Sequence, residues 1–284
     1  YAAYLFGIIK CDVAYLPKGE CSSWLIFLIK ILNKKTFTTI EGIYDKKNLE
    51  KAISFFGSKN SLLKWHSAQD ENYSITAFLA KFNEKKTGLK SESKPLYLGV
   101  DGDLFEFSLK TKLSDVIMIG YNLKNKGIED YLALADSFKD LNFHVVGDID
   151  DYDLSKQIRV SKVKNIILHG RLDHEALNQL LKKIDLHIFP SRSEGFPKVI
   201  LETASSGVPS LIYADYGASE WMKTNYDGII VENIDEMKLA IKNLISSKEL
   251  ISSLSKNARK LALDFDWKIR IKDWESVILT LAKS

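Results

Sequence analysis

Short apolar runs alternate along most of the chain with longer stretches in which apolar residues recur every three or four positions. The short runs are rich in β-branched residues, which favours strands, and they lie at residues 12–16, 36–40, 96–100, 116–119, 143–146, 165–168, 186–189, 208–213 and 228–231. The stretches between them, such as those around Tyr131 and Leu181, have the spacing of amphipathic helices. Beyond residue 234 the pattern predicts helices only. This alternation indicates an α/β fold with doubly wound parallel sheets.

The domain organisation follows from the length and from one interruption of the pattern. A chain of 284 residues fits two domains, and glycines with three acidic residues interrupt the pattern at residues 99–107. We expect domains at residues 1–103 and 104–263, followed by a helix at 264–284, which the family resemblance described below implies returns to the first domain. The first domain offers three or four strands, fewer than the roughly six of a doubly wound domain. Since the chain begins inside a predicted helix, we expect this domain to be incomplete at its start.

Composition and charge narrow the class of protein. The chain is 45% hydrophobic and 27% charged, which is typical of soluble globular proteins. Two cysteines are too few for a disulfide framework, and no apolar run reaches the roughly 18 residues of a membrane span. We expect a cytoplasmic location. Residues 1–100 contain 15 Lys and Arg against 9 Asp and Glu, and the remainder 25 against 28. The basic first part indicates either an anionic partner or unevenly distributed solvated lysines.

The densest cluster of turn residues lies at residues 190–209, which contain three of the five prolines. There a predicted buried strand runs into a polar loop, Pro197 suits the first position of a helix, and Gly207 suits the position just beyond its end. This predicts a helix of about ten residues whose N-terminus lies at the carboxyl edge of a parallel sheet, where α/β folds bind ligands. The first amides of the helix, at residues 198–200, would bind a phosphate group.

Two glutamates, Glu194 and Glu202, flank this turn. The spacing alone often marks two solvated side chains. Beside a phosphate-binding turn, we expect Glu194 to accept hydrogen bonds from the hydroxyl groups of a sugar. We expect Glu202, which is about one and a half turns into the helix, to bind the hydroxyl groups of a ribose.

The segment 188–209 resembles the nucleotide-sugar signature of the retaining GT-B glycosyltransferases, specifically their large family 4. Further matches lie in the expected order at Gly120, Lys126 and Gly127 (a phosphate-binding segment), residues 146–148, residues 167–170, Gly217, Glu220, residues 265–267 and, in the first domain, residues 99–101 with Phe105. The resemblance covers the second domain strongly and the first weakly. It implies two Rossmann-like domains that face each other across a cleft, with the nucleotide sugar in the second and the acceptor in the first.

The resemblance also implies a reaction and a set of site residues. A sugar would pass from a UDP-sugar, or less often a GDP-sugar, to a glycan or lipid-linked acceptor with retention of anomeric configuration, in polysaccharide or glycolipid assembly. Lys126 and the helix N-terminus would carry the departing diphosphate, and the backbone after residue 170 would read the base. The catalytic residues would be Glu194, Lys126 and Glu41. The donor-binding residues would be Gly120, Tyr121, Lys126, Arg171, Leu172, Glu194, Gly195, Phe196, Pro197, Lys198, Val199 and Glu202.

Two residues depart from the family pattern. Tyr121 stands where the family has a phosphate-binding arginine, and Lys124 offers a second charge nearby. Glu41 stands where the family has a histidine at the end of a first-domain strand. A glutamate there accepts hydrogen bonds from hydroxyl groups or stabilises a developing positive charge, whereas a histidine can be cationic. As an alternative, Glu41 is an exposed turn residue.

Other interpretations are weaker. The chain has no glycine-rich dinucleotide or Walker loop, its five histidines have no metal-ligand spacing, and we expect no nucleic-acid partner. Four aspartates at residues 148–153 admit a metal site, but Asp153 stands where an EF-hand needs glycine. They also resemble the D-x-D motif of metal-dependent glycosyltransferases of a different fold. Because the loop follows a predicted strand that ends near Gly147, and because the resemblance implies a family that uses no metal, we expect no metal cofactor. Two functions remain as alternatives: an epimerase or hydrolase of the same architecture, and a non-catalytic partner subunit.

A further set of lysines concerns the acceptor side. Lys34, Lys35, Lys46 and Lys47 lie close to Glu41 in the sequence. They form either a solvated rim or a contact to an anionic membrane surface or a lipid-linked pyrophosphate. In the second case the protein would attach peripherally to the inner face of the cell membrane.

Overall fold

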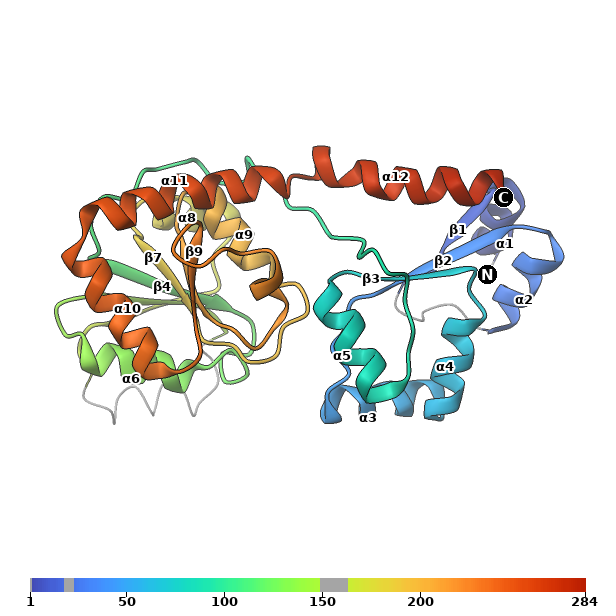
Figure 1. Cartoon of the computed structure of the whole chain (residues 1–284), viewed down its shortest axis with the longest axis horizontal. Coiled ribbons are helices and arrows are strands. Elements are labelled where there is room, and N and C mark those ends of the chain that lie inside the picture. The colour runs from blue at the N-terminus through green and yellow to red at the C-terminus, as the bar shows by residue number, and fades with distance from the viewer. Residues whose placement is uncertain (1, 18–22, 149–162) are drawn as a thin grey trace. The chain divides into compact units, whose positions relative to one another are not determined.

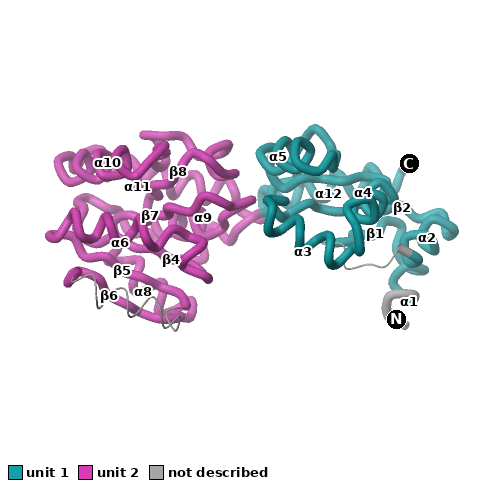
Figure 2. The backbone as a smooth tube through the Cα atoms, turned by 90° about the horizontal axis from the view of Figure 1, so that it is seen from below, with its two compact units in different colours: residues 1–98, 268–284 teal, residues 99–267 magenta. Residues whose placement is uncertain are grey.

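The computed structural model describes residues 2–17, 23–148 and 163–284. The chain divides into two compact units, the first made of Tyr1–Leu98 and Lys268–Ser284 and the second of Gly99–Trp267 (Figure 2). These boundaries lie a few residues from those expected at 103/104 and 263/264. Unit 1 is therefore assembled from both ends of the chain, and unit 2 is one continuous segment.

Unit 1 is built on a three-stranded parallel sheet in the order β1 (Val13–Tyr15), β2 (Lys35–Ile40), β3 (Glu71–Ser74). Its helices are α1 (Ala2–Lys10), α2 (Ser23–Ile31), α3 (Lys46–Phe56), α4 (Lys59–Ser67), α5 (Ala77–Thr87) and all but the first residue of α12 (Trp267–Lys283). Side chains fix where the helices begin: Asp45 accepts from the N–H of Asn48 at α3, and Thr76 accepts from that of Leu79 at α5.

The terminal helix α12 packs into the core of unit 1. Leu281 forms a buried cluster with Phe37 of β2 and with Leu96, and Trp274 packs against this cluster. The indole N–H of Trp274 also donates to the carbonyl of Tyr97 over 2.9 Å. Residues 268–284 are thus part of the core of unit 1.

In the first hundred residues, one predicted strand is wrong and one strand was not predicted. The segment 96–100 is no strand: only Val100 forms an isolated bridge, with Asp266. The N–H of Leu96 donates to the carbonyl of Ser74, whereas that of Val100 donates to the carbonyl of Phe265. The two ends of this run therefore hydrogen-bond to different segments, and the run does not pair along one neighbouring strand. The sequence analysis also missed β3, because its four residues, Glu71–Ser74, have no apolar alternation.

Unit 2 contains a six-stranded sheet in the order β6-β5-β4-β7-β8-β9, and every pairing is parallel. Its strands are β4 (Asp115–Gly120), β5 (Asn142–Gly147), β6 (Ile166–Gly170), β7 (Leu186–Phe189), β8 (Ser210–Tyr213) and β9 (Gly228–Val231). Every residue of β7 and β8 is buried, because helices cover both faces. The expected α/β fold with parallel sheets is confirmed.

The helices of unit 2 are α6 (Ile128–Ser137), α8 (His174–Leu181), α9 (Lys198–Ser205), α10 (Ile234–Ser246) and α11 (Lys248–Asp264), with a short 3-10 helix, η2 (Gly217–Glu220). Figure 1 shows α6 and α10 on one side of the sheet and α8, α9 and α11 on the other. The strand order reverses between the adjacent strands β4 and β7, and such a switch point is where open α/β sheets bind ligands. In the described part of the chain, no helix has the length and apolar character needed to cross a membrane.

Candidate functional site

The loops after β4 and β7 meet at the switch point of unit 2, and glycines make their close approach possible. Gly127 has a left-handed backbone (φ +83°), and a Cβ there would lie 2.2 Å from the carbonyl oxygen of Pro190. At the end of β5, a Cβ on Gly147 would lie 1.9 Å from the carbonyl oxygen of Gly120. Neither position admits a side chain without a shift of backbone. The glycines therefore bring the phosphate-binding loop predicted at residues 120–127 against the loop that carries Glu194.

The central contact of the site is an ion pair between the Lys126 ammonium and Oε1 of Glu194. The hydroxyl of Ser191 donates to the same oxygen over 2.7 Å. The two charged side chains are 24% and 13% exposed, so the pair is only partly solvated. Lys126 Nζ also lies 5.5 Å from the centre of the Phe189 ring. The structure thus brings together two of the three expected catalytic residues.

Helix α9 begins beside this pair. Its N-cap is Pro197 and its eight residues are Lys198–Ser205, so Pro197 precedes the helix and the helix is shorter than the ten residues expected. The N–H groups of Lys198 and Val199 lie in the first turn, where the helix itself supplies no carbonyl partner. The N–H of Ile200, expected to be available as well, donates to the carbonyl of Pro197 over 3.1 Å. Two amides and the positive end of the helix dipole therefore remain for an anion.

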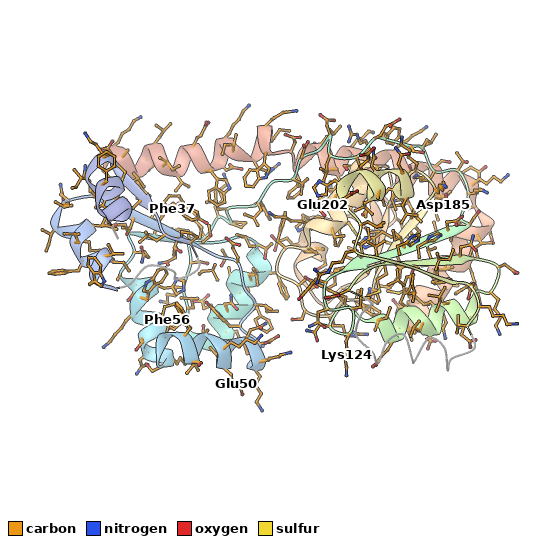
Figure 3. The ribbon with its side chains drawn as sticks, turned by 180° about the vertical axis from the view of Figure 1, so that it is seen from behind. Phe37, Glu50, Phe56, Lys124, Asp185 and Glu202 are labelled. Carbon is orange, nitrogen blue, oxygen red and sulfur yellow. The ribbon has the colours of Figure 1, made fainter. Side chains whose placement is uncertain are left out.

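Glu202 lies on α9, and Figure 3 labels it. Its side chain is half-buried, and its carboxylate has no hydrogen-bond or ion-pair partner among the described residues. Burial raises the pKa of the Glu202 carboxyl above its ordinary value, while Lys198 and His174 act in the opposite direction. Among the described residues, the Glu202 carboxylate is therefore available to accept further hydrogen bonds.

The ends of β4, β5 and β6 carry a second charged group. The guanidinium of Arg171 lies 5.5 Å from the ring centre of Tyr121 and pairs with Asp148 over 2.8 Å. Tyr121 is 70% exposed. The side chain of Leu172 packs in part against the buried core, and the expected role of its backbone in reading the base stays a prediction. At the position where the family has an arginine, this chain presents an aromatic ring beside an arginine from another strand.

Arg192, which lies in the loop after β7, was not among the predicted site residues. Its guanidinium lies 4.0 Å from the ring centre of Tyr213 and pairs with Asp215 over 3.1 Å. The N–H of Gly217 donates to the carbonyl of Glu194, so the loops after β7 and β8 are joined twice. The polar character of residues 190–197 indicated that this loop makes such contacts. It did not reveal their partners, which lie on or after β8 (Tyr213, Asp215 and Gly217). Gly195 and Phe196 follow in this loop, and the Phe196 ring packs near Trp221 and Phe265.

Two further predictions fall elsewhere. Glu41 lies in unit 1 just after β2, where its Oε1 accepts a hydrogen bond from the hydroxyl of Thr39 over 3.2 Å, and its catalytic role stays a prediction. Of the aspartates considered for a metal site, Asp148 pairs with Arg171, whereas Asp150, Asp151 and Asp153 lie outside the described residues. Within the described ranges, no group of three or more His, Cys, Asp or Glu side chains could hold a metal ion.

Comparison with known families agrees with this geometry. The model of the glycosyl transferases group 1 matches residues 102–261, which is more than half of the chain. The chain belongs to this family. The matched residues contain the Lys126–Glu194 pair, α9 and the whole sheet of unit 2. The finer features implied by the resemblance, which are family 4 and retention of configuration, stay predictions.

Curated relatives share part of the sequence. The chain is 27% identical over 165 residues to the alpha-galactosylglucosyldiacylglycerol synthase of Streptococcus pneumoniae, a match that covers 56% of this chain and 44% of that protein. It is 28% identical over 157 residues to the N,N'-diacetylbacillosaminyl-diphospho-undecaprenol alpha-1,3-N-acetylgalactosaminyltransferase of Campylobacter jejuni, covering 54% and 41%. The chain thus spans less than half the length of these two relatives.

Solved structures extend the likeness to the whole chain. Sucrose-phosphate synthase from Thermosynechococcus elongatus matches with a TM-score of 0.81 at 16% identity, covering 100% of this chain and 77% of that one. Anabaena HepE in complex with UDP matches with a TM-score of 0.77 at 16% identity, covering 97% and 81%. At such identities the likeness shows the fold alone, and it confirms the expected glycosyltransferase architecture.

Proposed function

We propose that the protein is a glycosyltransferase that moves a hexose or N-acetylhexosamine from a nucleotide sugar to a hydroxyl group of an acceptor, with retention of configuration at the anomeric carbon. The observation that carries the proposal is the Lys126–Glu194 ion pair, which lies at the switch point of the sheet beside the N-terminus of α9. This arrangement offers a cation and helix amides to a diphosphate and a carboxylate to a neighbouring sugar.

The donor would occupy three adjoining parts of this site. Its diphosphate would lie on Lys126 and on the amides of Lys198 and Val199. Its ribose would bind Glu202, whose half-buried carboxylate has no partner among the described residues. Its sugar would contact Glu194. A UDP-sugar is favoured over a GDP-sugar, because the similarly folded Anabaena HepE was solved with UDP.

In the reaction, the acceptor oxygen forms a bond to the anomeric carbon while the bond from that carbon to the phosphate oxygen breaks. The acceptor proton passes to the departing phosphate oxygen, on the same face of the sugar. The protein supplies positioning and stabilises the charge that develops on the diphosphate. Lys126 and the α9 N-terminus provide this positive charge, so we propose that no metal ion is needed.

The acceptor would bind to unit 1. The name of the Campylobacter jejuni relative describes a lipid-linked diphosphate acceptor, and the first hundred residues of this chain are basic. Lys46 and Lys47 are exposed at the start of α3, where they would face an anionic lipid surface or a lipid pyrophosphate. In this arrangement the protein would attach peripherally to the inner face of the membrane and act in polysaccharide or glycolipid assembly.

The test is to incubate the full-length protein with a panel of UDP- and GDP-sugars, with and without a lipid extract, in the presence of EDTA. We expect nucleotide release that requires both a donor and the extract. Release or conversion without an acceptor would instead indicate a hydrolase or an epimerase, and binding without turnover would indicate a partner subunit. Activity that EDTA abolishes and Mn²⁺ restores would contradict metal independence.

A further inference from the structure

One oxygen of Glu194 is fully engaged in this structure. Oε1 accepts from both the Lys126 ammonium and the Ser191 hydroxyl, the latter over 2.7 Å. The other oxygen, Oε2, has no hydrogen-bond partner among the described residues. The carboxylate is therefore held by one oxygen and presents the other. Its orientation depends on two donors that differ in length, charge and mobility.

Ser191 is the more rigid of the two donors. It follows β7 by two residues, its side chain is fully buried, and the preceding residue, Pro190, lies against Gly127. The hydroxyl makes a single hydrogen bond, to Glu194. A buried hydroxyl that lost this partner would be unsatisfied, so Ser191 and Glu194 hold each other in place. Lys126, by contrast, reaches the carboxylate at the end of a long, flexible side chain.

We propose that Ser191 is a positioning residue that keeps Oε2 of Glu194 directed at the donor sugar when the diphosphate draws Lys126 away. This inference rests on the proposed function. A diphosphate carries more negative charge than one carboxylate, so it competes with Glu194 for the Lys126 ammonium. Ser191 has no charge, and its buried hydroxyl donates to Glu194. Its hold on Oε1 therefore persists in the donor complex, where the orientation of Glu194 matters for turnover.

The first experiment compares Ser191→Ala with the wild-type full-length protein in turnover and in UDP binding. We expect kcat to fall about 10- to 100-fold, which is the size of effect typical of a lost hydrogen bond to a charged group. The dissociation constant of UDP, which lacks the sugar, should change less than twofold. Ser255→Ala is the control, because Ser255 is equally buried and its hydroxyl oxygen accepts a hydrogen bond from the N–H of Lys110 in another part of unit 2.

A double-mutant cycle separates positioning from a general structural effect. In a Glu194→Ala background, Ser191→Ala should cause no further loss of kcat, because Ser191 acts only through Glu194. Ser191→Cys provides a second variant that keeps the packing and offers a weaker donor, and its kcat should lie between those of wild type and Ser191→Ala. Thermal unfolding of each variant shows whether the fold is retained.

The outcomes distinguish this proposal from the one on which it rests. If the wild-type protein transfers sugar but Ser191→Ala and Ser191→Cys behave like Ser255→Ala, the role of Ser191 is overturned while the transferase proposal stands. Additive losses in the cycle would overturn it too. If the wild-type protein neither binds UDP nor turns over any donor, the proposed function itself is overturned, together with this role.

Discussion

Lys126 and Glu194, which are 68 positions apart in the sequence, form an ion pair at the point where the strand order of unit 2 reverses. Because the two are paired, Glu194 would compete with a diphosphate for Lys126, and Lys126 would compete with a sugar hydroxyl for Glu194. In the proposed donor complex, a diphosphate would share or displace Glu194 on Lys126, and a sugar hydroxyl would bind the other oxygen of Glu194. Binding of the nucleotide and orientation of the sugar would then be coupled through the Lys126 ammonium, so variants of the two residues should differ in their effect on UDP affinity.

Lys126→Ala should weaken UDP binding by about 1.5–3 kcal/mol, because a hydrogen-bonded charge on the diphosphate is lost. Glu194→Ala should leave UDP affinity unchanged or raise it, since it removes the competing carboxylate, but should lower kcat. Calorimetry with UDP and initial rates with the nucleotide sugar measure the two effects. A drop in UDP affinity with Glu194→Ala as large as its drop in rate would contradict this division.

Glu202→Ala should weaken UDP binding by about 1–3 kcal/mol without unfolding the protein. Burial already disfavours the charged form of this carboxyl, so its removal should leave stability equal to or above that of wild type. Glu175→Ala is the control, because Glu175 is an exposed glutamate in the first turn of α8. An unchanged dissociation constant for UDP would rule out contact between Glu202 and the ribose.

Gly127→Ala should destabilise the protein more than Gly57→Ala. Both glycines are left-handed, with φ +83° and +81°, but a Cβ at residue 127 meets the Pro190 carbonyl at 2.2 Å, whereas one at residue 57 has nothing within 4 Å. The strained backbone alone costs roughly 1–3 kcal/mol, so the excess at Gly127 measures the loop contact. Urea unfolding gives both values, and UDP affinity should fall for Gly127→Ala only. Equal stabilities would mean that the two loops separate at little cost.

His187 should make the protein lose stability in mild acid. Burial lowers the pKa of His187 from its ordinary 6.5 to about 3, so below pH 6.5 the unfolded chain binds a proton that the folded protein does not. The stability that this group contributes is present above pH 6.5 and is lost as the pH falls towards 3, by at most about 1.4 kcal/mol per pH unit. Urea unfolding from pH 7 to 4 should show a smaller slope for His187→Gln. An identical slope would mean that His187 binds a proton as readily in the folded protein as in the unfolded chain.

Lys46 and Lys47 lie in the first turn of α3, where the helix dipole disfavours positive charge. Replacing both with Glu should therefore raise thermal stability slightly, while it weakens binding to vesicles of anionic lipid at low salt. Lys85→Glu with Lys86→Glu, in the last turn of α5, makes the same change of charge at another site of unit 1. Equal vesicle binding by the two double variants would leave Lys46 and Lys47 as a solvated rim.

The apolar pattern predicted unit 2 well, because its central strands, above all β7 and β8, are buried on both faces and appear in the sequence as short apolar runs. The pattern failed for two short segments of the first hundred residues. Residues 96–100 are apolar because Leu96 packs with α12, and the polar strand β3 has no alternating pattern to reveal it. For such short segments, the tertiary neighbours decide whether a strand forms.

The site was predictable where local turn chemistry marks it. Prolines and glycines located the loop at residues 190–197, and Glu194 and Glu202 could then be named as candidate acceptors because they flank this turn; their roles stay predictions. The contacts of Ser191, Arg192 and Arg171 could not be predicted in this way. Each of these contacts depends on the conformation of a loop. The partners of Arg192 and Arg171 also lie at the ends of other strands, and no local sequence pattern shows that these strand ends are close together.

The discontinuity of unit 1 has a consequence for synthesis of the chain. Unit 2, Gly99–Trp267, is one continuous segment, whereas unit 1 needs residues 268–284 for its core. A ribosome completes unit 2 before it has made α12. Unit 2 can therefore fold during translation, but unit 1, although residues 1–98 are made first, must wait for α12 to reach Phe37 and Leu96.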